Sequence, residues 1–348
     1  MCPPYRVIVD VMMIAVEISV HKIMSETGKW KSRLLSSSVP MEYEVAKMLV
    51  ASGYVIDSDY TYARDDAGLT KDFSVDIRAT GYLPFKSKNY RATLELLVEC
   101  KHRHQGNKWL FFPDPNIDEM SPFVLGRTMR AVDNFSKVFF HPNCTVPFDA
   151  DAIFCMKGVE VDASSGTVHD SEIKHGLAQL QYALPSLLAD NIRFNMPAHE
   201  DDNSPFIFCP ILLTTSELLV ARNDISIKSV EHASTLEDIA VPAKYVILHL
   251  YPTPDFERHQ QISCASLAEL AKRPLTKNLD AFRRDQGEYE FRLPSVLCTE
   301  LANLNGRKFQ EYFSQTVVCS LEHFPDLIEE IKKVATKAVK SIKKQRAS

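Results

Sequence analysis

KDFSVDIR, at residues 71–78, and LELLVECK, at residues 94–101, are the two stretches that decide the fold of this chain. Polar and apolar side chains alternate along both, which is the period-two pattern of a β-strand. The first is predicted to turn one apolar face to the core, formed by Phe73, Val75, Ile77 and Ala79. The second has an apolar face of Leu94, Leu96, Val98 and Cys100, and an opposite face of Glu95, Leu97, Glu99 and Lys101. We therefore predict two strands of one sheet.

The turn between these strands predicts how they pair. Polar residues fill positions 86–89, and the midpoint between Asp76 and Glu99 is position 87.5, inside that turn. A symmetric hairpin then places Asp76 opposite Glu99, with the two Cβ atoms about 4.5–5.5 Å apart. Two carboxylates this close repel each other unless a cation lies between them. Mg²⁺ suits such a site because it takes one or two carboxylates together with water and substrate phosphate.

A helix is predicted just before the hairpin, over residues 41–52. Pro40 suits a first helical turn, Ser38 is a possible cap, and Gly53 ends the helix. The apolar face of this helix is predicted to be Val45, Ala46, Leu49 and Val50. Glu42 precedes Val45 and Ala46 by three and four residues, so it shares their inward stripe, whereas Glu44 falls on the Lys47 side.

Further helix and strand patterns alternate along the chain. Strands are predicted at about 54–62, 72–83, 90–101, 151–156, 206–214, 218–221, 245–251 and 316–321, and helices at 175–189, 307–313 and from Pro325 onward. This alternation predicts an α/β or α+β fold with a mixed central sheet flanked by helices. We expect an N-terminal extension and linker at 1–38, a core domain at 39–260, and a C-terminal extension at 261–348 that ends in a basic helix.

Composition excludes several classes of protein. Of the residues, 45% are hydrophobic and 24% charged, as in an ordinary globular protein, and no glycine-rich nucleotide loop occurs among only 11 glycines. The net charge of −5 argues against general adhesion to nucleic acid, although the last 22 residues carry +5 (seven Lys and Arg against two Glu). The eight cysteines form no CxxC pair and have apolar neighbours, so we expect buried thiols in a reducing cytoplasm.

The N-terminal stretch Val7–Val20 is too short and too charged to span a membrane, because Asp10 and Glu17 interrupt it. It is also a poor signal peptide, and Met24 and Met41 are plausible later start sites. No other segment is a membrane candidate. We therefore expect a cytoplasmic protein without a membrane partner.

The hairpin with its preceding helix resembles the PD-(D/E)xK nuclease superfamily, which has the restriction-endonuclease-like fold. In that superfamily one strand carries an acidic residue and the next carries Asp/Glu-x-Lys, here Asp76 and Glu99-Cys100-Lys101. The order Met41-Glu42, apolar helix, Gly53-Tyr54 is similar to the Mrr-like branch. The proline that gives the motif its name is missing before Asp76. The resemblance covers roughly residues 40–260, with its specific motifs confined to 42–101.

The resemblance implies a metal-dependent nuclease that hydrolyses DNA in restriction or other defence, and it leaves RNA open as a substrate. Asp76, Glu99 and the Cys100 backbone carbonyl would hold Mg²⁺, for which Mn²⁺ could substitute, while Lys101 and Glu42 complete the catalytic set. Cutting both strands needs two active sites, so a homodimer is plausible. The candidate contacts to nucleic acid are Arg78, His102, Arg103, Lys108 and Gln179. Gln179 is included because such nucleases often carry a glutamine on a later helix.

Other interpretations remain open at this point. An E-x-K triplet on a strand is often accidental, and Asp76, Glu99 and Lys101 could form ordinary ion pairs on a solvated sheet face. A nuclease fold could also serve as an inactive module that binds nucleic acid or a protein. The apolar run Trp109–Phe112 is more typical of a protein core than of a platform on which bases stack. The final helix could either pack on the domain or serve as a basic arm that holds DNA. The sequence assigns no role to residues 261–320.

Overall fold

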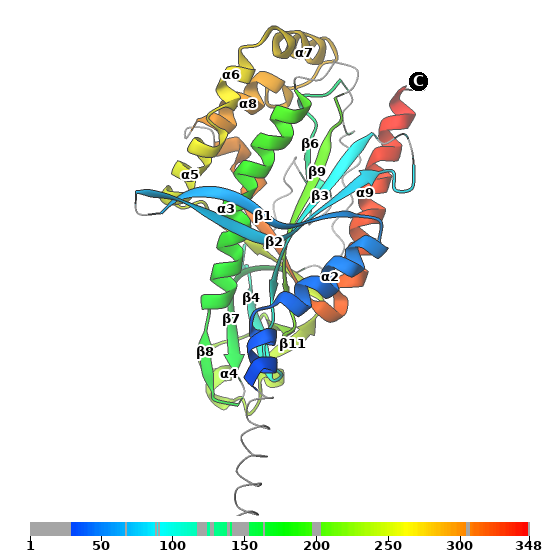
Figure 1. Ribbon diagram of the computed structural model, residues 1–348. Coiled ribbons are helices and arrows are strands. Elements are labelled where there is room, and N and C mark those ends of the chain that lie inside the picture. The colour runs from blue at the N-terminus through cyan, green and yellow to red at the C-terminus, as the bar shows by residue number, and fades with distance from the viewer. Residues whose placement is uncertain are drawn as a thin grey trace, which may run out of the picture.

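The computed structural model confirms a mixed α/β architecture, with a central sheet flanked by helices (Figure 1). The structure describes residues 29–66, 68–87, 89, 91–116, 124–125, 129–137, 140, 153–162, 164–196, 203–303 and 307–346. The predictions for Val7–Val20, Met24 and residues 151–152 lie outside this part of the chain.

The strands of the described chain belong to one sheet. They are β1 (Val55–Asp66), β2 (Leu69–Leu83), β3 (Ala92–Lys101), β4 (Asn107–Pro113), β5 (Val124–Leu125), β6 (Met129–Val132), β7 (Ile153–Asp162), β8 (Thr167–His169), β9 (Phe206–Thr214), β10 (Glu217–Ala221), β11 (Ala240–Ala243), β12 (Tyr245–His249) and β13 (Gln315–Ser320). Their order is β1-β2-β3-β9-β13-β12-β7-β4-β10-β11, with β5, β6 and β8 attached at the side. Parallel pairs join β3 to β9 and β9 to β13.

The helices are α2 (Val39–Ala51), α3 (Ser171–Asn195), α4 (Ile227–His232), α5 (Pro254–Cys264), α6 (Leu267–Ala271), α7 (Pro274–Asp285), α8 (Pro294–Ala302) and α9 (Phe324–Arg346). Short 3₁₀ turns lie at Leu236–Asp238, Glu290–Arg292, Arg307–Phe313 and Leu321–His323. The helices α5–α8 gather beside α3 at one end of the molecule (Figure 1). The segment 307–313, which was predicted to be an α-helix, forms a 3₁₀ turn. The helices α4 to α8 were not predicted from the sequence.

Two hydrophobic clusters cover the two faces of the sheet. On one face α3 packs with Leu97 and Leu212, and on the other α9 packs with Leu96, Val98 and Cys100. Figure 1 shows α3 and α9 on opposite sides of the strands between them. The predicted division of LELLVECK into two faces is thus confirmed, and Glu99 and Lys101 lie on the face that α3 covers. Trp109, Leu110 and Phe111 are buried, as expected of core residues.

The predicted hairpin register is confirmed. Strands β2 and β3 are antiparallel, and Ile77 pairs with Val98 and Leu83 with Ala92. The residue numbers of each pair in this ladder add up to 175. The same sum puts Asp76 across from Glu99, one step beyond the last pair of the ladder. Beyond that step β2 pairs only with β1. The single apolar face predicted for residues 71–79 is therefore wrong, because Phe73 and Val75 pack on the α3 side whereas Ile77 and Ala79 pack on the other. The physical reason is that two-stranded ribbons twist more strongly than wide sheets.

Several local expectations were wrong. Residues 29–36, expected to be part of a linker, are helical. Val50, expected on the apolar face of α2, is 58% exposed. Ser38 has a left-handed backbone (φ 61°) and makes no side-chain cap. Its hydroxyl instead accepts the backbone N–H of His102, which ties the start of α2 to the end of β3.

The C-terminal segment is part of the sheet rather than an extension of it. Strand β13 lies between β9 and β12, in the middle of the strand order. Helix α9 then buries Leu327, Ile331, Val334 and Ala338 against the sheet, which confirms a helix packed on the domain.

Candidate active site

Asp76 and Glu99 lie side by side at the point where β2 leaves β3. The carboxylate Oδ2 of Asp76 accepts the backbone N–H of Cys100 at 2.6 Å. The Glu99 side chain is only 1% exposed, and its Oε2 is buried with no hydrogen-bond partner in the described residues. The predicted carboxylate pair is therefore present, and one oxygen of Glu99 is available for a ligand.

Lys101 is held as a hydrogen-bond donor from two directions. Its Nζ lies 2.6 Å from Glu99 Oε1 and 3.1 Å from Gln179 Oε1 on α3. The amide nitrogen of Gln179 in turn donates to the Ser74 carbonyl on β2 at 3.1 Å. Gln179 thus links Lys101 on β3 to the backbone of β2. Its predicted contact with nucleic acid stays a prediction.

Burial and mutual repulsion raise the carboxyl pKa values at this site. The pKa of Glu99 rises to about 7, first because of its burial and then because of Asp76, and Lys101 offsets only part of this. The pKa of Asp76 is also raised, mainly by burial. Glu42 on α2 is half-buried, and burial together with repulsion from Asp76 raises its pKa to about 7. Glu44 is exposed, so the preference for Glu42 is confirmed.

Asp59 on β1 is a fourth acidic residue, which the sequence reasoning did not identify. Ser58 pairs with Ile77 and Tyr60 with Val75, so Asp59 occupies the position across from Asp76. Its backbone is left-handed (φ 58°), a conformation in which Asp is enriched among non-glycine residues. Its charge raises the pKa of both Asp76 and Glu42. The midpoint method would have found it, since 59 and 76 are symmetric about the turn at Gly68.

Helix α3 approaches the site through a glycine. A Cβ placed on Gly176 would lie 2.5 Å from Leu212 Cδ1, 3.2 Å from Lys101 Cε and 3.5 Å from Glu99 Cγ. A larger residue would therefore push on both catalytic candidates of β3. No local sequence signal marks this contact, because Gly176 and Lys101 are far apart in the chain.

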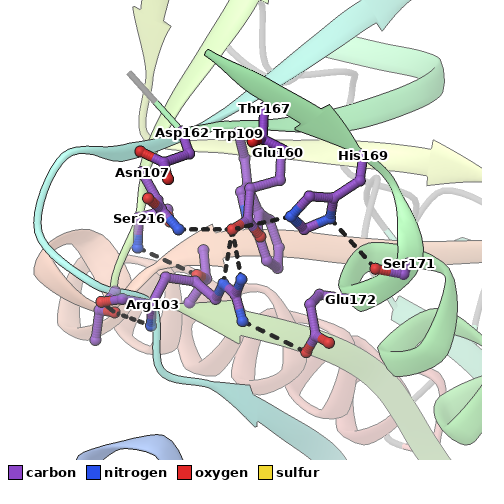
Figure 2. Close-up of polar contacts among 12 residues, drawn as sticks. Arg103, Asn107, Trp109, Glu160, Asp162, Thr167, His169, Ser171, Glu172 and Ser216 are labelled. Atoms are coloured by element: carbon purple, nitrogen blue, oxygen red, sulfur yellow. Dashed lines mark hydrogen bonds and ion pairs between the residues drawn. The ribbon is translucent and has the colours of Figure 1, made fainter. Parts of the chain in front are cut away.

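Arg103, a predicted nucleic-acid contact, is instead part of a buried network next to the site (Figure 2). Its guanidinium donates to Glu160 Oε1 at 2.9 and 2.5 Å, and Asn107 and Trp109 donate to the same carboxylate at 2.7 and 3.1 Å. Glu172 on α3 lies 3.6 Å from the other side of Arg103. Glu160 is completely buried, so this arginine anchors β3, β7 and α3 to one another.

The other predicted nucleic-acid contacts also have protein partners. Arg78 donates to Glu95 at 3.0 Å, and Lys108 lies 2.5 Å from Glu237 and 3.1 Å from Glu217. His102 is half-buried, which lowers its pKa. Contact of Arg78 or Lys108 with a phosphate would require an exchange of ion-pair partners.

The donor set fits a hard divalent cation, although only in part. Asp76 and Glu99 supply carboxylate oxygens, and Glu99 Oε2 is a buried oxygen that needs a partner. Within the described ranges, no three His, Cys, Asp or Glu side chains are grouped so that they could hold a metal ion. The residues therefore suit Mg²⁺ in the mode in which one or two carboxylates bind and water and substrate oxygens complete the shell.

The six cysteines of the described chain are all buried, as expected, and Cys2 and Cys144 lie outside it. None of the helices in the described part is long and apolar enough to cross a membrane. No protein-family model, curated protein or solved structure matches this chain.

Proposed function

We propose that this chain is a metal-dependent nuclease with a PD-(D/E)xK type of site that hydrolyses phosphodiester bonds in DNA. The observation that carries the proposal is the position of Lys101 Nζ, 2.6 Å from Glu99 Oε1, on the strand paired in register with Asp76. An accidental E-x-K triplet would have no reason to lie beside a second, partly buried carboxylate. Nor would it explain a helix packed against the lysine through a glycine.

The residues would divide the work as follows. Asp76 and Glu99 would hold Mg²⁺ or Mn²⁺, with help from the Cys100 carbonyl, and Glu42 would support the outer side of the site. Such an ion neutralises charge on the phosphate and lowers the pKa of coordinated water. Lys101 would orient the attacking water and offset the negative charge that develops on the phosphate.

A second candidate is a nuclease-like module that binds nucleic acid or a protein without cutting. The observation that favours it is the engagement of Arg78, Arg103 and Lys108 in ion pairs, which leaves those predicted phosphate contacts occupied. Calorimetry with Mn²⁺ separates the two candidates. Binding that is lost in Glu99→Gln supports the nuclease, and no binding by the wild type supports the module.

Cleavage of plasmid DNA with Mg²⁺ tests the activity directly. We expect the wild type to cut, Lys101→Ala to lose activity by about 100-fold or more, and the control Lys174→Ala to cut normally. Lys174 is an exposed lysine on α3 whose ion-pair partner is Asp170, away from the catalytic residues. Equal cleavage by Lys101→Ala and the wild type, at matched purity and folding, would reject the catalytic assignment. Parallel assays with RNA define the substrate class, and sedimentation tests for a homodimer.

A further inference from the structure

Three residues of α3 define the side of the helix that faces the candidate active site. Glu172 approaches Arg103, Gly176 would touch Lys101 Cε, and Gln179 accepts a hydrogen bond from Lys101 Nζ. Residues three and four apart lie on the same face of an α-helix. The positions between Glu172 and Gln179 that share this face therefore look toward the end of β3.

His175 is on that face. It lies three residues after Glu172 and four before Gln179, next to Gly176, and its side chain is exposed. Three charged groups act on it: Lys101 from β3, Asp76 from β2 and Glu172 from its own helix. The imidazole therefore lies at the solvent-facing edge of the carboxylate site.

The other groups at the site are committed to different tasks. Lys101 Nζ donates to two oxygens, so it acts as a donor and not as a proton acceptor. One oxygen of Asp76 accepts the Cys100 N–H, and Glu99 Oε1 accepts from Lys101. Although the side chain is exposed, the protein around it removes part of its hydration, and this desolvation together with the charge of Lys101 lowers the pKa of His175. The ring is therefore neutral and able to accept a proton near pH 7.

We propose that His175 is a catalytic base that takes a proton from the water attacking the scissile phosphate. This role rests on the proposed nuclease function. The water oxygen forms the new bond to phosphorus while one of its protons moves to an imidazole nitrogen. The bond from phosphorus to the leaving oxygen breaks, its electron pair stays on that oxygen, and solvent water supplies the proton that neutralises it. The imidazolium then returns its proton to solvent.

The test uses the full chain with Mg²⁺ and an oligonucleotide that the wild type cleaves. His175→Gln keeps a polar side chain but cannot accept a proton, and His104→Gln, an exposed histidine in the loop after β3, is the matched control. We expect His175→Gln to lower kcat by about 100- to 1000-fold with little change in KM, and to remove one ionisation from the acid limb of the pH profile. We expect added imidazole to restore part of the activity of His175→Ala, and His104→Gln to behave as the wild type.

Three outcomes would overturn this role. One is a wild-type kcat and pH profile in His175→Gln. Another is failure of imidazole to rescue a folded His175→Ala that has lost activity. The third is weaker Mn²⁺ binding by His175→Gln in calorimetry, because it would make the histidine a metal ligand. If the wild type cleaves neither DNA nor RNA, the nuclease proposal itself fails, whereas the three outcomes above leave it standing.

Discussion

At the residue scale, the site holds more negative charge than one lysine can balance. Asp76 repels both Glu42 and Glu99, Asp59 repels Glu42 and Asp76, and Lys101 offsets only part of this repulsion. A protein without a cation at this point holds protons instead, which is why burial and crowding bring two of these pKa values to about 7. Binding a divalent ion would release those protons.

This crowding predicts how stability depends on pH. The pKa of Glu99 is about 7 in the folded chain, against 4.5 for the ordinary group, so between these values the folded state binds more protons than the unfolded state. Stability contributed by the protonated carboxyl is therefore present below pH 4.5 and is lost as pH rises to 7. We expect the contribution of Glu99 to the stability of the metal-free protein to fall by on the order of 3 kcal/mol across this window, measured by urea unfolding as the difference between the wild type and Glu99→Gln.

A matched pair of variants isolates the contribution of Glu99. Glu99→Gln should flatten the decline between pH 4.5 and 7, whereas Asp65→Asn, an exposed carboxylate on β1, should leave it unchanged. Mg²⁺ should raise the melting temperature of the wild type more at pH 8 than at pH 5, because it binds the ionised form. A stability that rises with pH in the same window, without metal, would contradict the charge balance described here.

At the element scale, the parts that the sequence predicted are those set by local patterns. The hairpin of β2 and β3 follows from alternation and a polar turn, and its register came from one midpoint. The resemblance pointed to Gln179, but local patterns could not predict its hydrogen bond to Lys101 or that of Arg103 to Glu160, because the partners are separated by long stretches of chain. Arg103 therefore looked like a phosphate contact in the sequence, although a buried carboxylate holds it.

The packing of α3 on β3 gives a prediction about Gly176. Alanine usually stabilises a helix by about 1 kcal/mol relative to glycine. Here its Cβ would lie 2.5 Å from Leu212 Cδ1 and 3.2 Å from Lys101 Cε, in a buried place where neither neighbour can move freely. We expect Gly176→Ala to destabilise the protein by about 1–3 kcal/mol and to reduce cleavage, as measured by urea unfolding and the plasmid assay.

Lys174→Ala, on the exposed side of the same helix, should leave both measurements close to the wild type. This control separates a change in helix propensity from the close approach of the helix to the strand. Gly176→Ala that is more stable than the wild type and equally active would mean that α3 is not packed against Lys101 as described.

At the scale of the whole molecule, the catalytic candidates of β3 and the basic helix α9 lie on opposite faces of the sheet, which the sequence could not predict. The catalytic candidates of β3 lie on the α3 side of the sheet, whereas α9 covers the face that contains Cys100. The exposed lysines of α9, including Lys333, Lys337 and Lys340, are thus carried by the layer opposite α3. This arrangement favours a packed helix over a basic arm that reaches DNA at the site.

The central position of β13 leads to a prediction about truncation. Val317–Ser320 pair with β9, and Gln315–Cys319 pair with β12. A chain that ends at residue 260 would remove the strand that joins β9 to β12, and would remove α9 from one whole face of the core. Because folded domains are stable by only about 5–15 kcal/mol, the loss of a central strand and its covering helix should prevent folding.

We therefore expect the 1–260 fragment to show no cooperative thermal unfolding and to expose apolar surface that binds a hydrophobic dye. A chain that ends at Lys340 retains β13 and the buried residues of α9 through Val339, and should unfold cooperatively. The comparison separates the two parts of the C-terminal segment, since only the first deletion removes a strand, β13, from the sheet. Cooperative unfolding of the 1–260 fragment would show instead that the nuclease-like core is independent of β13, as the division at residue 260 first suggested.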